Sequence, residues 1–168
     1  MAEKFALRPM HSHDIPAVLE LHAILLPVSY SPSFFLHLLI QPTRICLIAA
    51  HEHSNRDSRP VAFISAVVHP EQRIEILTLG VLPTFRQHRL ATRLVYAAID
   101  ALTGAMPATV DVFAQVSASN VPATSFYKHM GLHPSTVVIR DMFRTLPCGS
   151  RDAYIVSGRI QPPDGPDK

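Results

Sequence analysis

The stretch from residue 73 to residue 102 constrains the fold of this chain more than any other part of it. Residues 73–81, "RIEILTLGV", form an apolar, β-branched run of strand length that contains one carboxylate, Glu75. Residues 89–102 place their apolar side chains on one stripe of a helix. A strand followed closely by an amphipathic helix is typical of α/β domains.

The turn between these two elements carries arginines where the start of a helix already has positive partial charge: Arg86, Arg89 and Arg93. One interpretation is an anion site, because unpaired N–H groups in the first turn of a helix bind anions and an arginine adds a charge-assisted contact. The other interpretation is that the arginines are solvated surface residues.

Further segments of strand length or helical period surround this unit. Helices are expected from Asp14, an N-cap followed by Pro16, from about Ser33, and over residues 120–130, where Asn120 caps the start and Gly131 ends the helix. Strands are expected at residues 5–8, 45–50, 61–68, 108–117, 135–143 and 152–158.

This order of elements predicts a mixed α/β sheet in a single domain. The domain is expected to span residues 1–160, and residues 161–168, rich in proline, are expected to be a disordered tail. The chain has 168 residues, of which 48% are hydrophobic and 17% charged, as in a folded globule rather than a disordered chain.

The charge and cysteine content exclude several kinds of partner and location. A net charge of +2 is too small to indicate nucleic acid as the main partner, although it mildly favours an anionic ligand. No apolar run approaches the ~20 residues that span a bilayer, and the N-terminus lacks an apolar signal stretch, so no membrane association is expected. The two cysteines, Cys46 and Cys148, are too few for a disulfide framework. We therefore expect a reducing compartment, the cytoplasm or also the nucleus.

Ten histidines raise the question of a metal site. The pairs His11/His13 and His51/His53 each lack a third ligand at a recognisable spacing, so we interpret them as loop histidines and expect no metal. Residues 51–60 are expected to be an exposed hairpin loop.

Several motifs occur in register along the chain. Residues 86–91, "RQHRLA", are similar to the pyrophosphate motif Arg/Gln-x-x-Gly-x-Gly/Ala, and further matches are "LPVSY", "ILTLG", "SNVPATSFYKHMGL" and "RDAYIV". With these motifs nearly the whole chain resembles the GCN5-related N-acetyltransferases, and among them the catalytic subunit of the NatE-type N-terminal acetyltransferases. The resemblance implies a single-domain α/β fold with a mixed, mostly antiparallel sheet of about seven strands and about four helices.

The resemblance also implies acetyl-CoA as cosubstrate. It assigns coenzyme binding to Leu79, Gly80, Val81, Arg86, Gln87, His88, Arg89, Leu90, Ala91, Thr92, Asn120, Ala123, Phe126 and Tyr127. The backbone N–H groups of residues 79–81 are expected to orient the thioester carbonyl. Arg89 departs from the family, which usually has glycine there, and a positive φ at this position would strain an arginine. Either the loop adapts or coenzyme affinity falls; we expect adaptation, because Ala91 keeps the later small residue.

The resemblance assigns two catalytic positions. Tyr127 matches the position that protonates the departing sulfur, whereas the alternative is a tyrosine that only packs under the sheet. Glu75 and Gln115 stand where NatE-like relatives have a tyrosine and a histidine. Glutamine cannot act as a base, so Glu75 is the candidate base, directly or through a water molecule. The alternative is that Glu75 faces solvent or pairs with Arg73 or Arg140.

Substrate binding is implied for Leu26, Pro27, Val28, Tyr30, Leu77, Gln115, Met142 and Phe143. Met142 and Phe143 replace a Tyr-Tyr pair, which keeps apolar area and deletes two hydroxyl groups. The implied substrate is a protein N-terminus that begins with methionine and an apolar second residue, acetylated by direct attack in a ternary complex. The implied partner is the NatA complex, with its auxiliary subunit, on the ribosome.

Two other readings stay open. One is a weak or inactive acetyl-CoA-binding structural subunit, suggested by the departures at positions 75, 89 and 115. The other is acetylation of a lysine or a small amine. A lysine amine has a pKa of ~10.4 against ~8 for an α-amine and demands a stronger base, which favours the α-amine.

Overall fold

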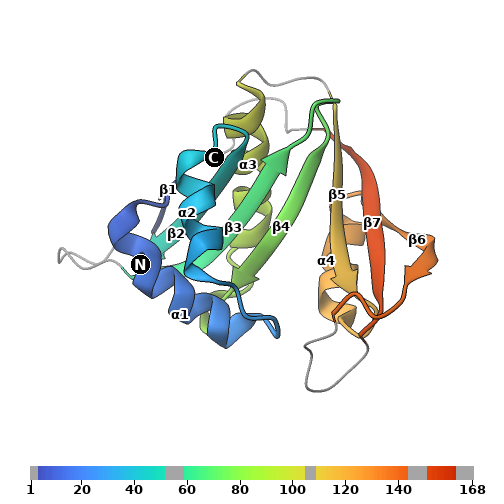
Figure 1. Cartoon of the computed structure of the whole chain (residues 1–168), viewed down its shortest axis with the longest axis horizontal. Helices are drawn as coiled ribbons and strands as arrows, with labels where there is room; N and C mark the ends of the chain where they lie inside the picture. The colour runs from blue at the N-terminus through green and yellow to red at the C-terminus, as the bar shows by residue number, and fades with distance from the viewer. Residues whose placement is uncertain (1–3, 52–58, 105–108, 144–150, 162–168) are drawn as a thin grey trace.

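The computed structural model describes residues 4–51, 59–104, 109–143 and 151–161 (Figure 1). Within these residues one seven-stranded sheet has the order β1-β2-β3-β4-β5-β7-β6. Every neighbouring pair is antiparallel except β4 and β5, which are parallel. The strands are β1 Phe5–Pro9, β2 Arg44–His51, β3 Pro60–Val68, β4 Ile74–Val81, β5 Val110–Ser117, β6 His133–Ile139 and β7 Ala153–Ile160.

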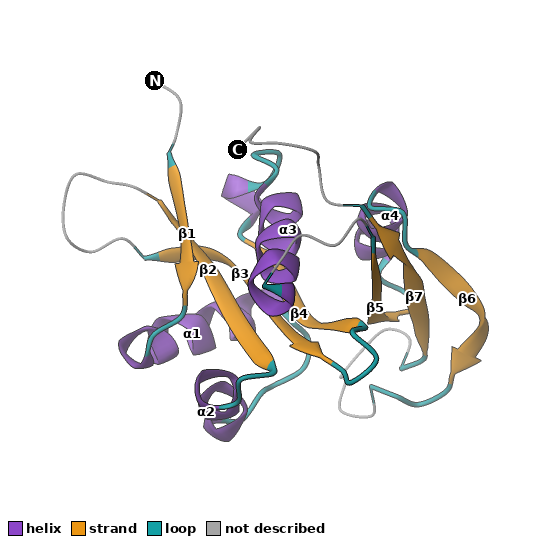
Figure 2. Cartoon of the chain, turned by 90° about the horizontal axis from the view of Figure 1, so that it is seen from above, coloured by secondary structure: helices purple, strands orange, loops and turns teal. Residues whose placement is uncertain are grey.

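Helices cover both faces of the sheet. Helices α1 (Ile15–Leu25) and α2 (Pro32–Ile40) lie on one face, and α3 (Leu90–Thr103) and α4 (Val121–His129) lie on the other (Figure 2). Two short 3₁₀ helices, η1 (Ser12–Asp14) and η2 (Pro83–Phe85), precede α1 and α3. The predicted fold class and order of elements are confirmed. Among the described residues, no helix combines the length and apolar character needed to cross a bilayer.

Each face of the sheet has its own apolar core. Under α3 the core is built from alternate residues of the central strands together with a helix stripe that includes Leu90, Leu94 and Ile99. Under α1 and α2 a smaller core contains Phe35 and Phe63, both fully buried. Cys46 belongs to this smaller core, whereas Cys148, residues 52–58 of the predicted loop and residues 162–168 of the predicted tail lie outside the described part of the chain.

The junction of β4 and β5 positions the site. The two strands pair over only three positions, Ile74 with Val112, Glu75 with Phe113 and Ile76 with Ala114. Beyond Ile76 they diverge, as the V-shaped opening between the two halves of the sheet shows (Figure 1). A bulge at the same place changes the register between β3 and β4, because Ala66 pairs with Ile76 and Ser65 with Thr78.

The bulge leaves Leu77 without a partner across the ladder. Before it, Ile74 and Ile76 are buried in the core under α3; after it, Thr78 is buried against His22 of α1. The bulge therefore redirects the side chains of β4 at the point where the sheet opens.

Candidate active site

A cleft of about 540 Å³ lies between the end of β4, the first turn of α3 and the first turns of α4. All of the predicted coenzyme-binding residues line it except His88. The ring of His88 instead contacts Phe5 of β1 edge-on, at 5.3 Å between centroids. Pro122, which belongs to the motif "SNVPATSFYKHMGL", also lines the cleft, as do Leu25 and Phe85, which no motif in the sequence marked.

The turn before α3 has an unusual backbone. Gln87 and Arg89 are not glycines, yet their φ angles are +69° and +56°. The expectation that the loop would adapt is therefore wrong, because Arg89 keeps the left-handed conformation that glycine adopts without strain. A left-handed non-glycine residue costs roughly 1–2 kcal/mol.

This backbone presents the start of α3 to the cleft. Arg89 is the N-cap residue, and the first helical hydrogen bond runs from the N–H of Arg93 to the carbonyl of Arg89 at 3.0 Å. Among the described residues, the N–H groups of Leu90, Ala91 and Thr92 have no acceptor. A helix start with convergent N–H donors fits a diphosphate.

The sequence left two interpretations of the three arginines in this region, an anion site or solvated surface residues, and the three differ in their positions. Arg86 and Arg89 line the cleft, and the Nε of Arg86 donates to the carbonyl of Val81 at 3.2 Å. Arg93 points away from it and donates to the carbonyl of Phe5 at 3.4 Å. Two of the arginines thus add positive charge to the cleft, while the third ties α3 to β1.

A second, smaller cavity of about 170 Å³ lies beside the cleft. All of the predicted substrate-binding residues line it except Met142, whose side chain lies at the surface. No charged side chain is among the described residues that line it. Leu26, Leu79, Asn120 and Tyr127 line both spaces, so the cavity and the cleft share a wall.

Tyr127 occupies this shared wall. Asn120 caps α4 by accepting a hydrogen bond from the N–H of Ala123 at 3.1 Å, and the helix then carries Tyr127 to a buried position. Burial raises the pKa of Tyr127 well above its usual range. The hydroxyl is therefore protonated at neutral pH, and within the described residues it has no hydrogen-bond partner. The ring also packs in the core under α3. Tyr127 therefore packs under the sheet and lines the site at the same time, so the two interpretations of this residue do not exclude each other.

Glu75 lines neither space, but it contacts a residue that does. Gln115 of β5, which lines the smaller cavity, donates from Nε2 to Glu75 Oε1 at 3.4 Å. The other carboxylate oxygen is 2.9 Å from Nε2 of His69. We expected Arg73 or Arg140 as the alternative partner of Glu75, yet the guanidinium of Arg73 lies over the ring of Phe113, 4.8 Å from its centroid.

His69 was not among the residues predicted from the sequence. Glu75 pairs with Val67 across the β3–β4 hairpin, so His69 is diagonal to Glu75 on the same face of the sheet. That relation follows from the register of the hairpin, which the sequence motifs do not define.

Under the smaller cavity lies a chain of buried polar groups that the sequence did not indicate. Nδ1 of His22 donates to the carbonyl of Val18 at 2.8 Å, and Nε2 is 3.1 Å from the hydroxyl of Thr78, which is 2.6 Å from Ser65. Burial lowers the pKa of His22 to about 4, so the imidazole is neutral and Nε2 accepts from Thr78. Thr78 lines the cavity, so this chain fixes one polar group of its wall.

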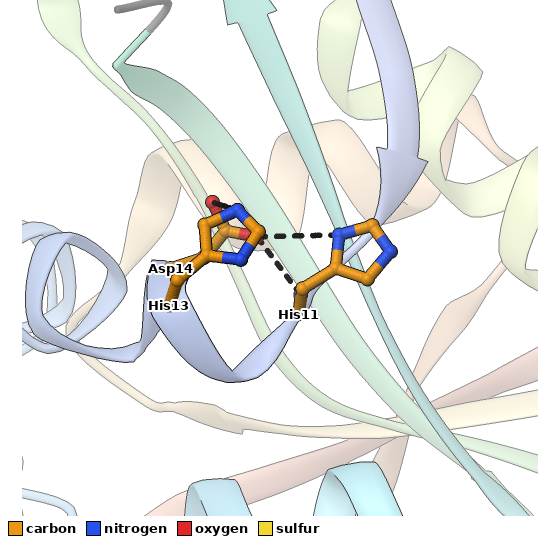
Figure 3. A group of neighbouring side chains, drawn as sticks. All are labelled: His11, His13 and Asp14. Atoms are coloured by element: carbon orange, nitrogen blue, oxygen red, sulfur yellow. Dashed lines mark hydrogen bonds and ion pairs between the residues drawn. The ribbon is translucent and has the colours of Figure 1, made fainter.

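His11, His13 and Asp14 form the group of possible metal ligands in the described residues, with ligand atoms within 4.8 Å of one another (Figure 3). The Arg8 guanidinium already holds the carboxylate of Asp14, at 2.6 and 2.8 Å, and lies 3.1 Å from Nδ1 of His11. The positive charge that neutralises the carboxylate of Asp14 therefore comes from Arg8. Asp14 is the predicted N-cap residue of α1, but its side chain accepts from Arg8 and the N–H of His11 rather than from the helix.

The chemistry of the two spaces defines a class of enzyme. The start of α3 offers N–H donors that suit a diphosphate, an uncharged cavity adjoins it, and a protonated tyrosine lines both spaces. This arrangement suits an acyltransferase that draws on an activated coenzyme. A sequence model of the Acetyltransferase (GNAT) family matches residues 15–132, and the chain belongs to that family. It is an acetyltransferase with acetyl-CoA as its cosubstrate.

Solved structures share the fold at low sequence identity. The Arabidopsis thaliana NAA60 structure in complex with acetyl-CoA has a TM-score of 0.78 and 22% identity, over 94% of this chain and 99% of that chain. Arabidopsis thaliana Naa50, in complex with the bisubstrate analogue CoA-Ac-MVNAL, has a TM-score of 0.73 and 20% identity, over 92% and 97%. Diaminobutyrate acetyltransferase EctA from Paenibacillus lautus, with its substrate and coenzyme A, has a TM-score of 0.65 and 20% identity, over 96% of both chains. No protein with a curated description matches the sequence significantly.

Proposed function

We propose that this acetyltransferase acetylates the α-amino group of protein N-termini. The observation that carries the proposal is the uncharged cavity that shares its wall, including Tyr127, with the coenzyme cleft. An amine must be neutral to attack a thioester, and an α-amine with a pKa of ~8 reaches that state far more readily than a lysine with ~10.4. Two of the similar structures are named NAA60 and Naa50, and the latter is in complex with the bisubstrate analogue CoA-Ac-MVNAL.

The reaction proceeds by direct attack in a ternary complex. The neutral amine adds to the thioester carbonyl, the tetrahedral intermediate collapses, and the C–S bond breaks to release the coenzyme thiolate. Beyond Ile76, the edge of β4 that faces β5 has no strand partner among the described residues, so its N–H groups around Leu79 to Val81 are available to the carbonyl oxygen.

Tyr127 acts on the leaving group. Its raised pKa makes complete proton transfer to a thiolate, whose conjugate acid has a pKa of ~8.5, unfavourable. The hydroxyl therefore stabilises the departing sulfur chiefly by donating a hydrogen bond, and solvent completes its protonation. Glu75 is the base that removes the amine proton, through a water molecule, because Gln115 lies between it and the cavity.

The cavity walls indicate the side chain of the first residue. Leu26, Pro27, Val28 and Phe143 provide apolar contact, and Tyr30 is the hydroxyl group placed to bind the peptide backbone. Burial raises the pKa of Tyr30, which keeps that hydroxyl protonated. We propose methionine, followed by an apolar residue, as the preferred N-terminus.

A peptide panel tests this function. It comprises Met-Leu and Met-Ala peptides with a free N-terminus, the same peptides blocked at the N-terminus, and blocked peptides that contain a lysine. Steady-state kinetics should give transfer to the free peptides alone. Transfer to the blocked lysine peptides, or to diaminobutyrate in preference to both, would establish a different acceptor.

A second candidate function is that of a coenzyme-binding structural subunit with little activity. Gln115 favours it, because this glutamine lines the acceptor cavity and cannot act as a base, whereas Glu75 lines neither space. Calorimetry with acetyl-CoA separates the two candidates: binding without transfer to any peptide identifies the subunit. In either case we propose the cytoplasm, or also the nucleus, as the location and the NatA complex with its auxiliary subunit, on the ribosome, as the partner, by resemblance to the NatE-type enzymes.

A further inference from the structure

Glu75 connects the acceptor cavity with the protein surface. One carboxylate oxygen accepts from Gln115, whose side chain lines the cavity, and the other lies 2.9 Å from Nε2 of His69. The Glu75 side chain is 16% exposed and the His69 side chain 42% exposed. Polar groups therefore run without interruption from the cavity through Gln115 and Glu75 to an imidazole in contact with solvent.

This arrangement addresses a step that the acetyl transfer requires in every turnover. The acceptor arrives as an ammonium ion, and its proton moves to the carboxylate of Glu75, which becomes a neutral carboxylic acid. Glu75 must then lose that proton before the next acceptor can react. A carboxylic acid that is largely shielded from water loses its proton slowly unless a neighbouring group accepts it.

We propose that His69 accepts this proton from Glu75 and passes it to solvent. The inference rests on the proposed function, in which Glu75 is the base. The Glu75 O–H bond breaks, an N–H bond forms at Nε2 of His69, and the imidazolium then releases the proton that it carries on Nδ1 to water or buffer. Before the next turnover the exposed ring returns to its Nδ1–H tautomer by proton exchange with solvent, which frees Nε2 to accept again. Imidazole suits this task because its ordinary pKa is the nearest to neutrality among the side chains.

The His69 ring has an aromatic neighbour on β5 in addition to the carboxylate of Glu75. The His69 ring lies 5.6 Å from the ring of Phe113, and the guanidinium of Arg73 lies over the same ring at 4.8 Å. Among the described residues, the hydrogen-bond partners of Glu75 are thus His69 from the β3–β4 turn and Gln115 from β5, and of these two only the imidazole can accept a proton and release it again.

The test is a steady-state measurement of kcat over many turnovers, with saturating acetyl-CoA and a free Met-Leu peptide as acceptor. The proteins compared are the wild type, His69→Ala, His69→Gln and the control His37→Ala, which removes an exposed histidine from α2. We expect both substitutions of His69 to slow acetyl transfer roughly tenfold to a hundredfold. His37→Ala should react at the wild-type rate.

The decisive readout is rescue by free imidazole at constant pH and ionic strength. Imidazole reaches the exposed position 69 and should restore most of the rate of His69→Ala, while the wild type and His37→Ala do not respond. Glutamine keeps a donor for Glu75 but does not titrate, so His69→Gln should stay slow although its thermal unfolding and acetyl-CoA affinity match the wild type.

Two results would overturn the inference alone: a His69→Gln enzyme as fast as the wild type, or a slow His69→Ala enzyme that imidazole leaves unchanged. Either one would reduce His69 to a hydrogen-bond donor or a packing residue. A wild-type protein that binds acetyl-CoA yet transfers nothing to the peptide would remove the proposed function, and this inference with it.

Discussion

Tyr127 combines two properties that usually exclude each other, burial in a core and access to a reaction site. Its ring packs under α3 while its hydroxyl position lies on the wall shared by the cleft and the cavity. We predict that Tyr127→Phe lowers kcat roughly tenfold to a hundredfold and leaves the KM for acetyl-CoA nearly unchanged, because only the interaction with the departing sulfur is lost. Steady-state kinetics check this.

Tyr96→Phe, which removes a hydroxyl from α3 outside both spaces, is the matched control and should keep wild-type kinetics. A Tyr127→Phe enzyme with unchanged kcat would show that the tyrosine only packs.

His22 makes stability depend on pH. Its folded-state pKa is about 4, below the ordinary value of 6.5. Between these two pH values the imidazole is protonated in the unfolded chain and neutral in the folded protein. The stability linked to His22 is complete above pH 6.5 and is lost as the pH falls toward 4, by up to about 3 kcal/mol. We predict that the difference in unfolding free energy between the wild type and His22→Gln shrinks over this window. Urea denaturation at pH 7, 6 and 5 measures it, and a constant difference would contradict the buried neutral imidazole.

Among the secondary-structure elements, β1 and the start of α1 are joined by one ion pair. The guanidinium of Arg8 holds both carboxylate oxygens of Asp14, and this hydrogen bonding lowers the pKa of Asp14 to about 2. A depressed carboxyl pKa stabilises the fold above the unfolded-state pKa of ~3.9, and that stability is lost as the pH falls toward 2.

We predict that Asp14→Asn lowers the free energy of unfolding at pH 7 by about 2 kcal/mol, and that the difference from the wild type disappears between pH 4 and pH 2. Asp111→Asn is the control, because the pair of Asp111 with Arg159 is exposed on both sides and should contribute less than about 1 kcal/mol. Equal losses in the two variants, measured by urea denaturation, would refute a special role of the Arg8–Asp14 pair.

At Arg89, in the turn before α3, two substitutions separate the effect of backbone strain from the effect of the side-chain charge. Arg89→Gly removes the strain of a positive φ together with the guanidinium, whereas Arg89→Ala removes the guanidinium and keeps the strain. We predict that both variants bind coenzyme A roughly tenfold more weakly, and that Arg89→Ala is the less stable of the two by about 1 kcal/mol. Calorimetry and urea denaturation measure the two effects. Unchanged coenzyme affinity in both variants would show that Arg89 contributes no charge to the cleft.

The elements themselves follow from local sequence, whereas the site depends on relations between them. The apolar stripe of residues 89–102 and the Asn120 cap predicted α3 and α4 correctly, because periodicity and capping are local properties. The bulge at Leu77 and the His69–Glu75 contact were not predicted, because they depend on the register of β3 against β4. The conformation of Arg89 was missed for another reason: the surrounding structure imposes it against the preference of an arginine.

Taken together, the two halves of the sheet meet along a short seam and are bridged by the ligand site. The seam is the three-residue pairing of β4 with β5, and the cleft beside it is lined by β4 and α3 on one side and by α4 on the other. A coenzyme bound there contacts both halves. Its binding energy therefore adds to the cohesion of the domain, because it binds the folded state alone.

We predict that acetyl-CoA at a hundredfold its Kd raises the free energy of unfolding by about 2.7 kcal/mol. Hydrogen exchange should slow in the first turns of both α3 and α4, since the N–H groups of Leu90, Ala91 and Thr92 gain an acceptor. Acetyl-pantetheine lacks the diphosphate, so at the same concentration it should leave the α3 amides unprotected and raise the melting temperature much less. Arg93→Ala, which alters an arginine that points to β1, should respond to acetyl-CoA as the wild type does. Equal protection of α3 by both ligands would mean that the helix start does not hold the diphosphate.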